Sequence, residues 1–408
     1  MRTSRKASTR LPLSGAALSL SLLLASIGGC EVSMLTAAGP GAPPTFTPPD
    51  AAADDAHRGS SIDLFRPPPW IAFLGARTYP AGRSAWAVTV ADLNRDGLDD
   101  LITTDATSSE VWTFLAQPGG GFSPGARTAV GAGPRSVLAA DFDEDGVMDI
   151  LTANRAGDDL TLALGSGDGT FHGLSSVPVG GHPDNIVRAD FDGDGKSDLA
   201  VATDSGAKLL IATAPTRFQK ARVILAPPSF YRLAVVDVDE DGRLDLAGVC
   251  NYMQPAGVLR NRGGGTFGPI ETLPVQSGGW VDSADLDGDG MPEIVMSDSA
   301  TKSAAVFHNR GDGTFDPAAH LYGPDPGFDG RLADLDGDGR PDLINGRLYH
   351  GDAAGGFDVN TPVSIPSGGT VGGYAVGDFN GDGRRDIATT VLGNNESHIA
   401  VFLQTTTD

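Results

Sequence analysis

An acidic nonapeptide recurs seven times in the sequence and forms its densest group of metal-ligand residues. Each copy has the form Asp-x-Asp/Asn-x-Asp-Gly-x-x-Asp/Glu, so oxygen-bearing side chains alternate along a loop in which a glycine permits a sharp turn. This chemistry suits Ca²⁺, which accepts roughly six to eight oxygen ligands in a flexible shell. Without a cation, the carboxylates of one loop would repel one another. The repeat therefore predicts up to seven calcium sites.

The expected ligands are the side chains at positions one, three, five and nine of each loop and the backbone carbonyl at position seven. In chain order these residues are Asp92, Asn94, Asp96, Leu98, Asp100, Asp141, Asp143, Asp145, Val147, Asp149, Asp190, Asp192, Asp194, Lys196, Asp198, Asp237, Asp239, Asp241, Arg243, Asp245, Asp285, Asp287, Asp289, Met291, Glu293, Asp334, Asp336, Asp338, Arg340, Asp342, Asp378, Asn380, Asp382, Arg384 and Asp386. An EF-hand would need an acidic residue at position twelve, and none of the seven copies has one. The repeat is therefore not an EF-hand.

The spacing of the loops predicts the architecture that positions them. Successive loops begin 44 to 49 residues apart, a period typical of stacked or radial units. Runs rich in Val, Ile, Thr and Leu predict four strands in the first unit, at Ala87–Ala91, Leu101–Thr104, Val111–Ala116 and Phe122–Thr128. Seven such units predict an all-β fold, a seven-bladed β-propeller of four-stranded antiparallel blades. A linear solenoid is the alternative, but it would need capping units that the sequence does not show.

A phenylalanine marks the outer strand of most units and indicates how the ring closes. Phe122 lies 30 residues after Asp92, and three later units repeat this spacing, but the seventh unit has no such residue. Phe73 precedes Asp92 by 19 residues, the same step that separates Phe122 from Asp141. We therefore expect the N-terminal strand Phe73–Tyr79 to complete the last blade and to remove an open sheet edge.

Two patterns resemble the FG-GAP/VCBS repeat family, and the resemblance covers residues 70–408. They are Ala189-Asp190-Phe191-Asp192-Gly193-Asp194-Gly195 and Gly311-Asp312-Gly313-Thr314-Phe315. The resemblance implies an integrin-α-like seven-bladed propeller, and members similar to this pattern include secreted lectin-like propellers and bacterial surface lipoproteins. The chain departs from the pattern at Asn94, Asn380 and Glu293, and its sixth unit is shortened. We expect weaker calcium binding there.

The first 29 residues resemble a bacterial export signal. Basic residues precede an apolar run from Leu11 to Ile27, and Ile27-Gly28-Gly29-Cys30 resembles a lipobox. This predicts a lipoprotein signal peptide over residues 1–29, lipidation of Cys30, and export to the bacterial outer membrane or cell surface. An ordinary cleaved signal peptide and an uncleaved membrane helix are less favoured alternatives.

Composition limits the partners of the mature chain. Residues 30–69 are rich in Ala, Pro, Gly and Asp, which predicts a disordered linker between the lipid anchor and the propeller at residues 70–408. The formal net charge is −23, and half of the acidic residues lie in the metal loops. No basic stripe offsets the repulsion from phosphates, so nucleic acid is disfavoured as a partner. We expect a monomer that meets the membrane only through its lipid.

Aromatic residues near the loops are candidate ligand contacts. Trp86, Tyr231, Trp280 and Tyr374 lie four to six residues before their metal loops, and Tyr252 lies in a loop expected on the same face, opposite the metal loops. Aromatic rings there could stack on sugars or hold a peptide. We therefore expect a calcium-stabilised, lipid-anchored binding or adhesion protein for a glycan or protein ligand.

The sequence contains no motif that predicts catalysis. It has no HExxH or P-loop pattern. His308 and His350 occupy equivalent places in neighbouring units, and we interpret them as solvated residues at strand ends. A polysaccharide lyase or hydrolase that uses the propeller funnel, and a non-catalytic scaffold in an envelope complex, remain alternatives to a binding protein.

Overall fold

The computed structural model describes residues 70–226, 230–250, 255–276, 278–298, 300–322, 329–365, 369–394 and 396–406. The predicted signal peptide, Cys30, the predicted linker and Tyr252 lie outside the described residues. Throughout the described ranges the regular structure is β-strand, and no helix there is long and apolar enough to cross a bilayer.

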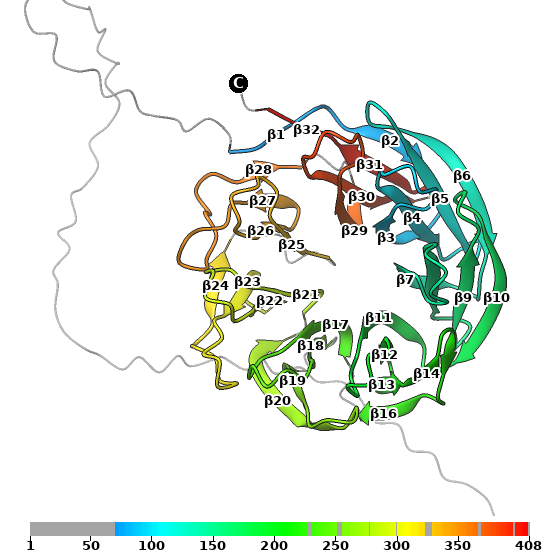
Figure 1. Cartoon of the computed structure of the whole chain (residues 1–408). Coiled ribbons are helices and arrows are strands. Elements are labelled where there is room, and N and C mark those ends of the chain that lie inside the picture. The colour runs from blue at the N-terminus through cyan, green and yellow to red at the C-terminus, as the bar shows by residue number, and fades with distance from the viewer. Residues whose placement is uncertain are drawn as a thin grey trace, which may run out of the picture. The chain divides into compact units, whose positions relative to one another are not determined.

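Seven four-stranded antiparallel sheets form a closed ring, which confirms the predicted β-propeller (Figure 1). The first strand of each blade lies nearest the centre of the ring, and the fourth lies outermost. Blades one to four consist of β3 (Ala85–Ala91), β4 (Asp100–Asp105), β5 (Glu110–Gln117) and β6 (Gly121–Ala129); β7 (Pro134–Ala140), β8 (Asp149–Asn154), β9 (Asp159–Gly165) and β10 (Phe171–Pro178); β11 (Pro183–Ala189), β12 (Asp198–Thr203), β13 (Gly206–Leu210) and β16 (Arg222–Leu225), with the added hairpin β14 (Ala212–Ala214) and β15 (Arg217–Phe218); and β17 (Phe230–Val236), β18 (Asp245–Cys250), β19 (Pro255–Asn261) and β20 (Phe267–Gln276).

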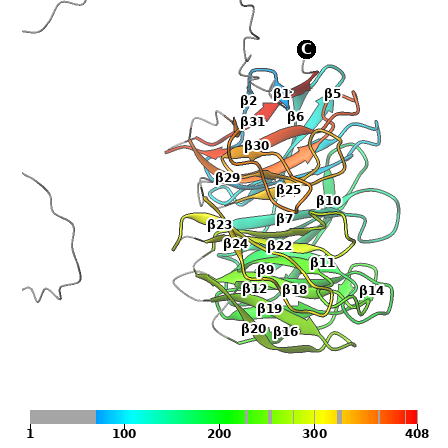
Figure 2. The same cartoon turned by 90° about the vertical axis from the view of Figure 1, so that its left-hand side faces the viewer.

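Blades five to seven complete the ring, and Figure 2 shows blades four and seven on opposite sides of it. These blades consist of β21 (Val281–Ala284), β22 (Glu293–Asp298), β23 (Ser303–Phe307) and β24 (Ala319–Tyr322); β25 (Arg331–Ala333), β26 (Asp342–Ile344), β27 (Arg347–Tyr349) and β28 (Val363–Ser364); and β29 (Thr370–Gly377), β30 (Asp386–Leu392), β31 (His398–Phe402) and β2 (Arg77–Pro80). Blade six has the shortest strands, in line with its shortened sequence unit.

The second strands are buried on both faces because each blade packs against two neighbours. All six residues of β4, β8, β12, β18 and β22 are buried. This explains why these segments are continuous apolar runs with small or threonine residues rather than alternating patterns. The apolar residues that flank every metal loop are also buried, so each loop is attached to the core at both ends.

The hydrophobic core is divided into seven clusters, one between each pair of neighbouring blades. The cluster between blades one and two joins Ile102 and Val111 to Val137 and Ile150. The cluster between blades seven and one joins Ile399 and Val401 to Leu101, Phe114 and Phe122. The ring therefore closes through the same kind of packing that holds its interior blades together.

The N-terminal segment completes blade seven, as predicted. Strand β2 pairs with β31, and β1 (Ala72–Phe73) pairs with β32 (Gln404–Thr405). Tyr79 of β2 packs against Phe122 of blade one, with ring centroids 5.5 Å apart in an edge-to-face arrangement. A segment near the start of the described chain therefore lies in the same sheet as a segment near its end.

The marker phenylalanines share one register position in all seven blades. Each is paired with a residue that lies within two positions of the end of the third strand, as in Ala116↔Phe122 and Asn309↔Phe315. In blade seven the corresponding pair is Phe73↔Gln404. Phe73 therefore replaces the phenylalanine that the seventh sequence unit lacks.

Candidate metal loops and the opposite face

The seven acidic loops connect the first and second strands of their blades. The turns between third and fourth strands lie at the same end of each sheet, because the strands are antiparallel. The connections from second to third strands and from one blade to the next lie at the other end. The two faces of the ring therefore carry different sets of loops, and one of them carries every acidic nonapeptide.

Hydrogen bonds from the backbone fold each acidic loop around its own side chains. In blade two, Asp141 Oδ2 accepts from Gly146 N at 2.8 Å, Asp143 Oδ1 accepts from Asp145 N at 3.2 Å, and Asp145 Oδ1 accepts from Val147 N at 2.7 Å. The first and third of these bonds recur in all seven loops. The glycine at position six has φ between 79° and 92°, a conformation that other residues adopt at a cost.

The carboxylate at position nine links the metal loop to the rest of its blade. In blade two, Asp149 Oδ2 accepts from Phe142 N and Asp149 Oδ1 accepts from Gly165 N, each at 2.8 Å. All seven blades repeat this pair of bonds, with Glu293 as the acceptor in blade five. The same side chain therefore fixes the start of the loop and the end of the third strand.

Burial raises the pKa of every position-nine carboxyl. The pKa rises to about 6 for Asp100, Asp245, Asp342 and Asp386, mainly because burial disfavours the charged form. Bonds from the backbone oppose the shift, whereas neighbouring loop carboxylates add to it. A bound cation would relieve both the desolvation and the repulsion.

The donor atoms fit a divalent cation. Ligand oxygens of Asp141, Asp143 and Asp149 all lie within 4.8 Å of one another, and other loops contain comparable groups. In blade four, the buried Oδ1 atoms of Asp237 and Asp239 have no hydrogen-bond partner among the described residues. An oxygen-only donor set of this kind is what Ca²⁺ prefers. The side chains at positions one, three, five and nine are those that would hold the ion.

In four loops a basic side chain at position seven lies against the carboxylate at position five. Lys196 Nζ is 2.5 Å from Asp194 Oδ2, and Arg384 Nη2 is 2.6 Å from Asp382 Oδ2. Arg243 and Arg340 make the same pairing with their own loops. A metal ion that used this oxygen would therefore compete with an internal cation in these loops.

On the opposite face, the first strands of five blades contain a β-bulge near their beginning. The bulged residues, in blades one, two, three, four and seven, are respectively Trp86 with Ala87, then Arg135, Asp184, Tyr231 and Gly372. A bulge turns a side chain out of the regular alternation and is common beside functional sites. Trp86 and Tyr231, two of the predicted ligand residues, both lie at such bulges.

The bulge residues and their neighbours form a polar and aromatic group across blades one to four, which we call the bulge patch. The Arg135 guanidinium lies 3.9 Å from the Trp86 ring centroid, and that of Arg232 lies 5.1 Å from the Tyr231 ring. Arg155 pairs with Asp184 and, at 2.8 Å, with Asp204. Burial lowers the pKa of Arg135, while the charges of Tyr231 and Asp184 oppose this shift.

The structure separates the predicted aromatic residues into two kinds. Trp86 and Tyr231 are half-buried and lie six residues before their loops. Trp280 and Tyr374 lie five and four residues before theirs, and they are only 1% and 2% exposed. Trp280 packs over the backbone of Gly330, and the Tyr374 hydroxyl accepts a bond from Gly346 N at 2.8 Å. These two rings are therefore buried, whereas Trp86 and Tyr231 are partly exposed.

A cavity of about 420 Å³ lies among the first strands. Trp86, Arg188, Arg232, Asp329 and Arg331 line it together with apolar residues and backbone from the central strands. Arg135, Asp184 and Tyr231 of the bulge patch each directly precede a lining residue in the sequence. A strongly acidic chain therefore has an arginine-bearing cavity at the centre of its ring.

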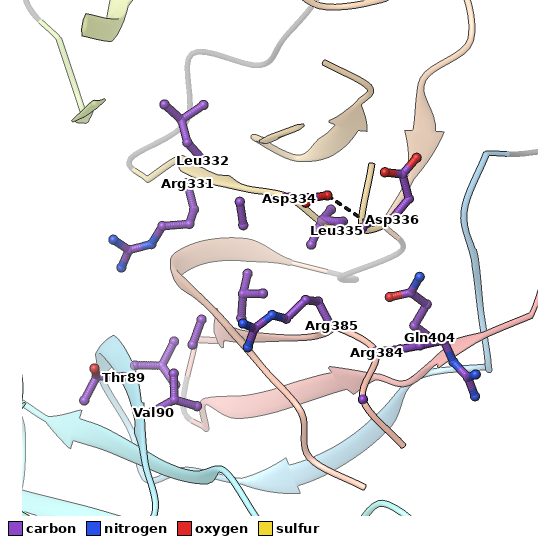
Figure 3. A pocket seen from close by; sticks show the side chains of 16 residues that line it. Thr89, Val90, Arg331, Leu332, Asp334, Leu335, Asp336, Arg384, Arg385 and Gln404 are labelled. Atoms are coloured by element: carbon purple, nitrogen blue, oxygen red, sulfur yellow. Dashed lines mark hydrogen bonds between the residues drawn. The ribbon is translucent and has the colours of Figure 1, made fainter. Parts of the chain in front are cut away.

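A second cavity of about 660 Å³ lies between blades six and seven, at the end of the sheets that carries the metal loops. Arg331, Arg385 and two carboxylates of the blade-six loop, Asp334 and Asp336, are among the residues that line it (Figure 3). The short strands of blade six leave this space beside blade seven.

The fold and the loops define a seven-bladed β-propeller built on a repeated acidic nonapeptide. The sequence matches the model of the FG-GAP-like repeat over residues 92–152, 141–201, 190–248, 237–296 and 285–344. These stretches span more than half of the chain, which therefore belongs to the FG-GAP-like repeat family. No curated protein sequence matches the chain.

Several solved structures share the fold. A lectin from Agrocybe aegerita, solved to explain its specific recognition of non-reducing terminal N-acetylglucosamine, has a TM-score of 0.50 at 20% identity, over 69% of this chain and 79% of the lectin. BBS1N in complex with ARL6DN, soaked with lead or mercury, has TM-scores of 0.58 and 0.59 at 14% identity, over 82% of this chain and 98% of BBS1N. At these identities the similarity establishes the fold alone.

Proposed function

We propose that this chain is a non-catalytic binding protein that recognises a negatively charged glycan on the face opposite its metal loops. The observation that carries the proposal is the bulge patch beside the arginine-lined central cavity. Aromatic and arginine side chains converge there, whereas the rest of the chain is strongly acidic. Neutral or positively charged ligands would gain little from this arrangement.

The chemistry of the patch suits an acidic sugar. An indole or phenol ring can stack on the apolar face of a pyranose, and a guanidinium can bind a carboxylate or sulfate through two parallel hydrogen bonds. Arg135 and Arg232 already lie against aromatic rings, which orients them. The Agrocybe aegerita lectin, which has a related fold, supports glycan recognition as a role for such a propeller.

The metal loops serve this function by stabilising the blades. We infer that calcium binds the nonapeptides and holds each first strand to its blade, so that the opposite ends of these strands keep the patch in place. The predicted lipid at Cys30 would attach the propeller to a bacterial envelope surface. Neither role requires a chemical reaction at the loops.

A glycan array tests the proposal, with the full chain in calcium-containing buffer and with acidic and neutral polysaccharides on the same array. Trp86→Ala and Arg135→Ala should each weaken binding to an acidic glycan about tenfold, equivalent to about 1.4 kcal/mol. Trp112→Ala is the matched control, because Arg127 lies 3.8 Å from the Trp112 ring centroid on outer strands of blade one. This control should bind like the parent.

Three outcomes would overturn the proposal. Equal binding by the parent and by the Trp86 and Arg135 variants would place the ligand elsewhere. Release of shortened glycan during incubation would indicate the polysaccharide-acting enzyme. Capture of a fixed envelope protein without glycan binding would indicate the scaffold.

A further inference from the structure

One position at the end of the third strand differs in kind between the blades. It directly precedes the residue whose backbone N–H binds the position-nine carboxylate, and we call it the loop-facing position. From blade one to blade seven it is occupied by Leu115, Leu164, Ile211, Arg260, His308, His350 and Leu403. Only blades five and six have a metal-ligating side chain there.

In blade six the imidazole points into the acidic loop. His350 Nε2 lies 3.1 Å from Asp336 Oδ2 and 3.3 Å from Asp338 Oδ2. This nitrogen is buried, yet it makes no hydrogen bond of acceptable geometry to any described residue. Ligand atoms of the three side chains all lie within 4.8 Å of one another. One nitrogen and two oxygens therefore converge on a common point. Asp338 Oδ2 also pairs with Arg340, so an ion that uses this oxygen displaces the guanidinium.

Blade five repeats this arrangement with a different pair of carboxylates. Ligand atoms of Asp287, Glu293 and His308 lie within 4.8 Å of one another, and Glu293 is fully buried. The turn of blade six covers the site, since a Cβ added at Gly355 would lie 2.8 Å from His308 Cε1 and 3.2 Å from Asp287 Cβ. Glycine at position 355 thus lets the neighbouring blade hold the imidazole against the loop.

Blade four shows that a charged group at the loop-facing position acts on the loop. Arg260 Nη1 lies 3.1 Å from Asp239 Oδ2, and its other terminal nitrogen donates to Gly313 O of blade five. The aliphatic residues of blades one, two, three and seven offer the loop no such group. The chemistry at this position therefore sets what cation each loop can hold.

We propose that the loops of blades five and six are mixed imidazole–carboxylate sites that bind a borderline divalent transition-metal ion, with zinc as the reference case. Imidazole nitrogen is a good ligand for Zn²⁺ and its first-row neighbours, whereas Ca²⁺ prefers oxygen alone. This inference modifies the metal role proposed above for two blades and leaves calcium to the loops without histidine.

The two sites differ in their surroundings. Trp70 lies over His350, with ring centroids 4.9 Å apart. Asp336 also lines the cavity between blades six and seven, which gives an ion a route to the site (Figure 3). A paramagnetic ion such as Co²⁺ at His350 should therefore quench the fluorescence of Trp70. Among the described residues, no tryptophan ring packs against His308.

Zinc stoichiometry in the presence of calcium tests the proposal. The full chain, purified without a histidine tag, is equilibrated with Zn²⁺ in about 1 mM Ca²⁺, a concentration typical of extracellular calcium sites, and its metals are counted after removal of free ions. The parent should retain two zinc ions per chain, His308→Leu and His350→Leu one each, and the double variant none. Leucine is the natural residue at this position in three other blades, so these variants should fold.

A reciprocal variant and a spectroscopic measurement complete the test. Leu164→His should add a zinc ion in blade two, and quenching by Co²⁺ should be lost in His350→Leu but retained in His308→Leu. Full displacement of zinc by calcium in the parent, or two zinc ions retained by the double variant, would overturn the proposal. The double variant should still be stabilised by calcium, and this separates a failure of the zinc sites from a failure of the calcium role.

Discussion

At the scale of single residues, the position-nine carboxylate has the widest influence on the structure. Each one accepts two backbone N–H bonds, one from the metal loop and one from a residue near the end of the third strand. In each blade the second of these donor residues is also paired with the marker phenylalanine or its equivalent. The carboxylate is buried, and burial raises its pKa. The two hydrogen bonds offset part of the free-energy cost of burying its charge. Blade assembly and the metal binding that we propose therefore depend on the same side chain.

Replacing such a carboxylate should destabilise the propeller even without metal. Asp149→Asn keeps the side-chain size but gives one of the two backbone N–H groups an amide nitrogen that cannot accept. We expect a loss of about 2 to 3 kcal/mol in the free energy of unfolding, the range for a charge-assisted hydrogen bond and an unsatisfied buried donor. Urea denaturation in EDTA measures it.

Glu144→Gln in the same loop is the control for charge, because Glu144 is exposed. It should change stability by less than about 0.5 kcal/mol, as surface substitutions do. Equal effects of the two substitutions would mean that the position-nine carboxylate acts only through its charge.

The metal-loop residues could be predicted from the sequence because the nonapeptide encodes a local structure. Turn glycines and alternating carboxylates act within nine residues, so no knowledge of the rest of the chain is needed. The double role of position nine could not be predicted, since its second partner, such as Gly165 for Asp149, lies on another strand. Trp86 and Tyr231 lie six residues before the loops of blades one and four. The same position in blades two and three holds Arg135 and Asp184, which the sequence could have indicated.

At the scale of elements, the N-terminal strand is the component that closes the ring. Strand β2 supplies the outer strand of blade seven and places Tyr79 against Phe114 and Phe122 of blade one. The Tyr79 hydroxyl also accepts a bond from Phe122 N at 3.2 Å. The seam between the first and last blades thus depends on a segment that precedes both.

Truncation of this tyrosine should open the seam. Tyr79→Ala should lower the free energy of unfolding by about 3 kcal/mol, as large-to-small aromatic substitutions in cores do. Tyr79→Phe removes only the hydroxyl and should cost about 1 kcal/mol. Thermal unfolding followed by circular dichroism measures both, and a Tyr79→Ala protein as stable as the parent would show that β2 is dispensable for closure.

The sequence predicted the arrangement of the strands more completely than the orientation of individual side chains. Period, strand composition and the phase of Phe73 were sufficient for seven blades and their closure, because each unit repeats the same pattern. Trp280 and Tyr374 show the limit. Both rings are buried, Trp280 within the lining of the central cavity and Tyr374 in a blade whose β-bulge lies at Gly372, and such packing arises from pairing between strands that composition does not reveal.

At the scale of the whole molecule, seven similar wedges share seven similar interfaces and seven acidic loops on one face. Half of the acidic residues lie in those loops, so cations bound there would offset part of the net charge of −23 while they hold each blade together. A loop that binds calcium with a Kd of about 0.1 mM would add about 1.4 kcal/mol at about 1 mM calcium. Several such loops would rival the stability of an ordinary domain.

Thermal unfolding of the full chain with calcium and with EDTA tests this claim most directly. We predict a melting temperature higher by about 10 °C or more in about 1 mM calcium, because several kcal/mol of binding energy act on a domain of this size. Magnesium at the same concentration should give a smaller rise, since it demands stricter octahedral geometry. Superimposable melting curves in calcium and in EDTA would contradict the account.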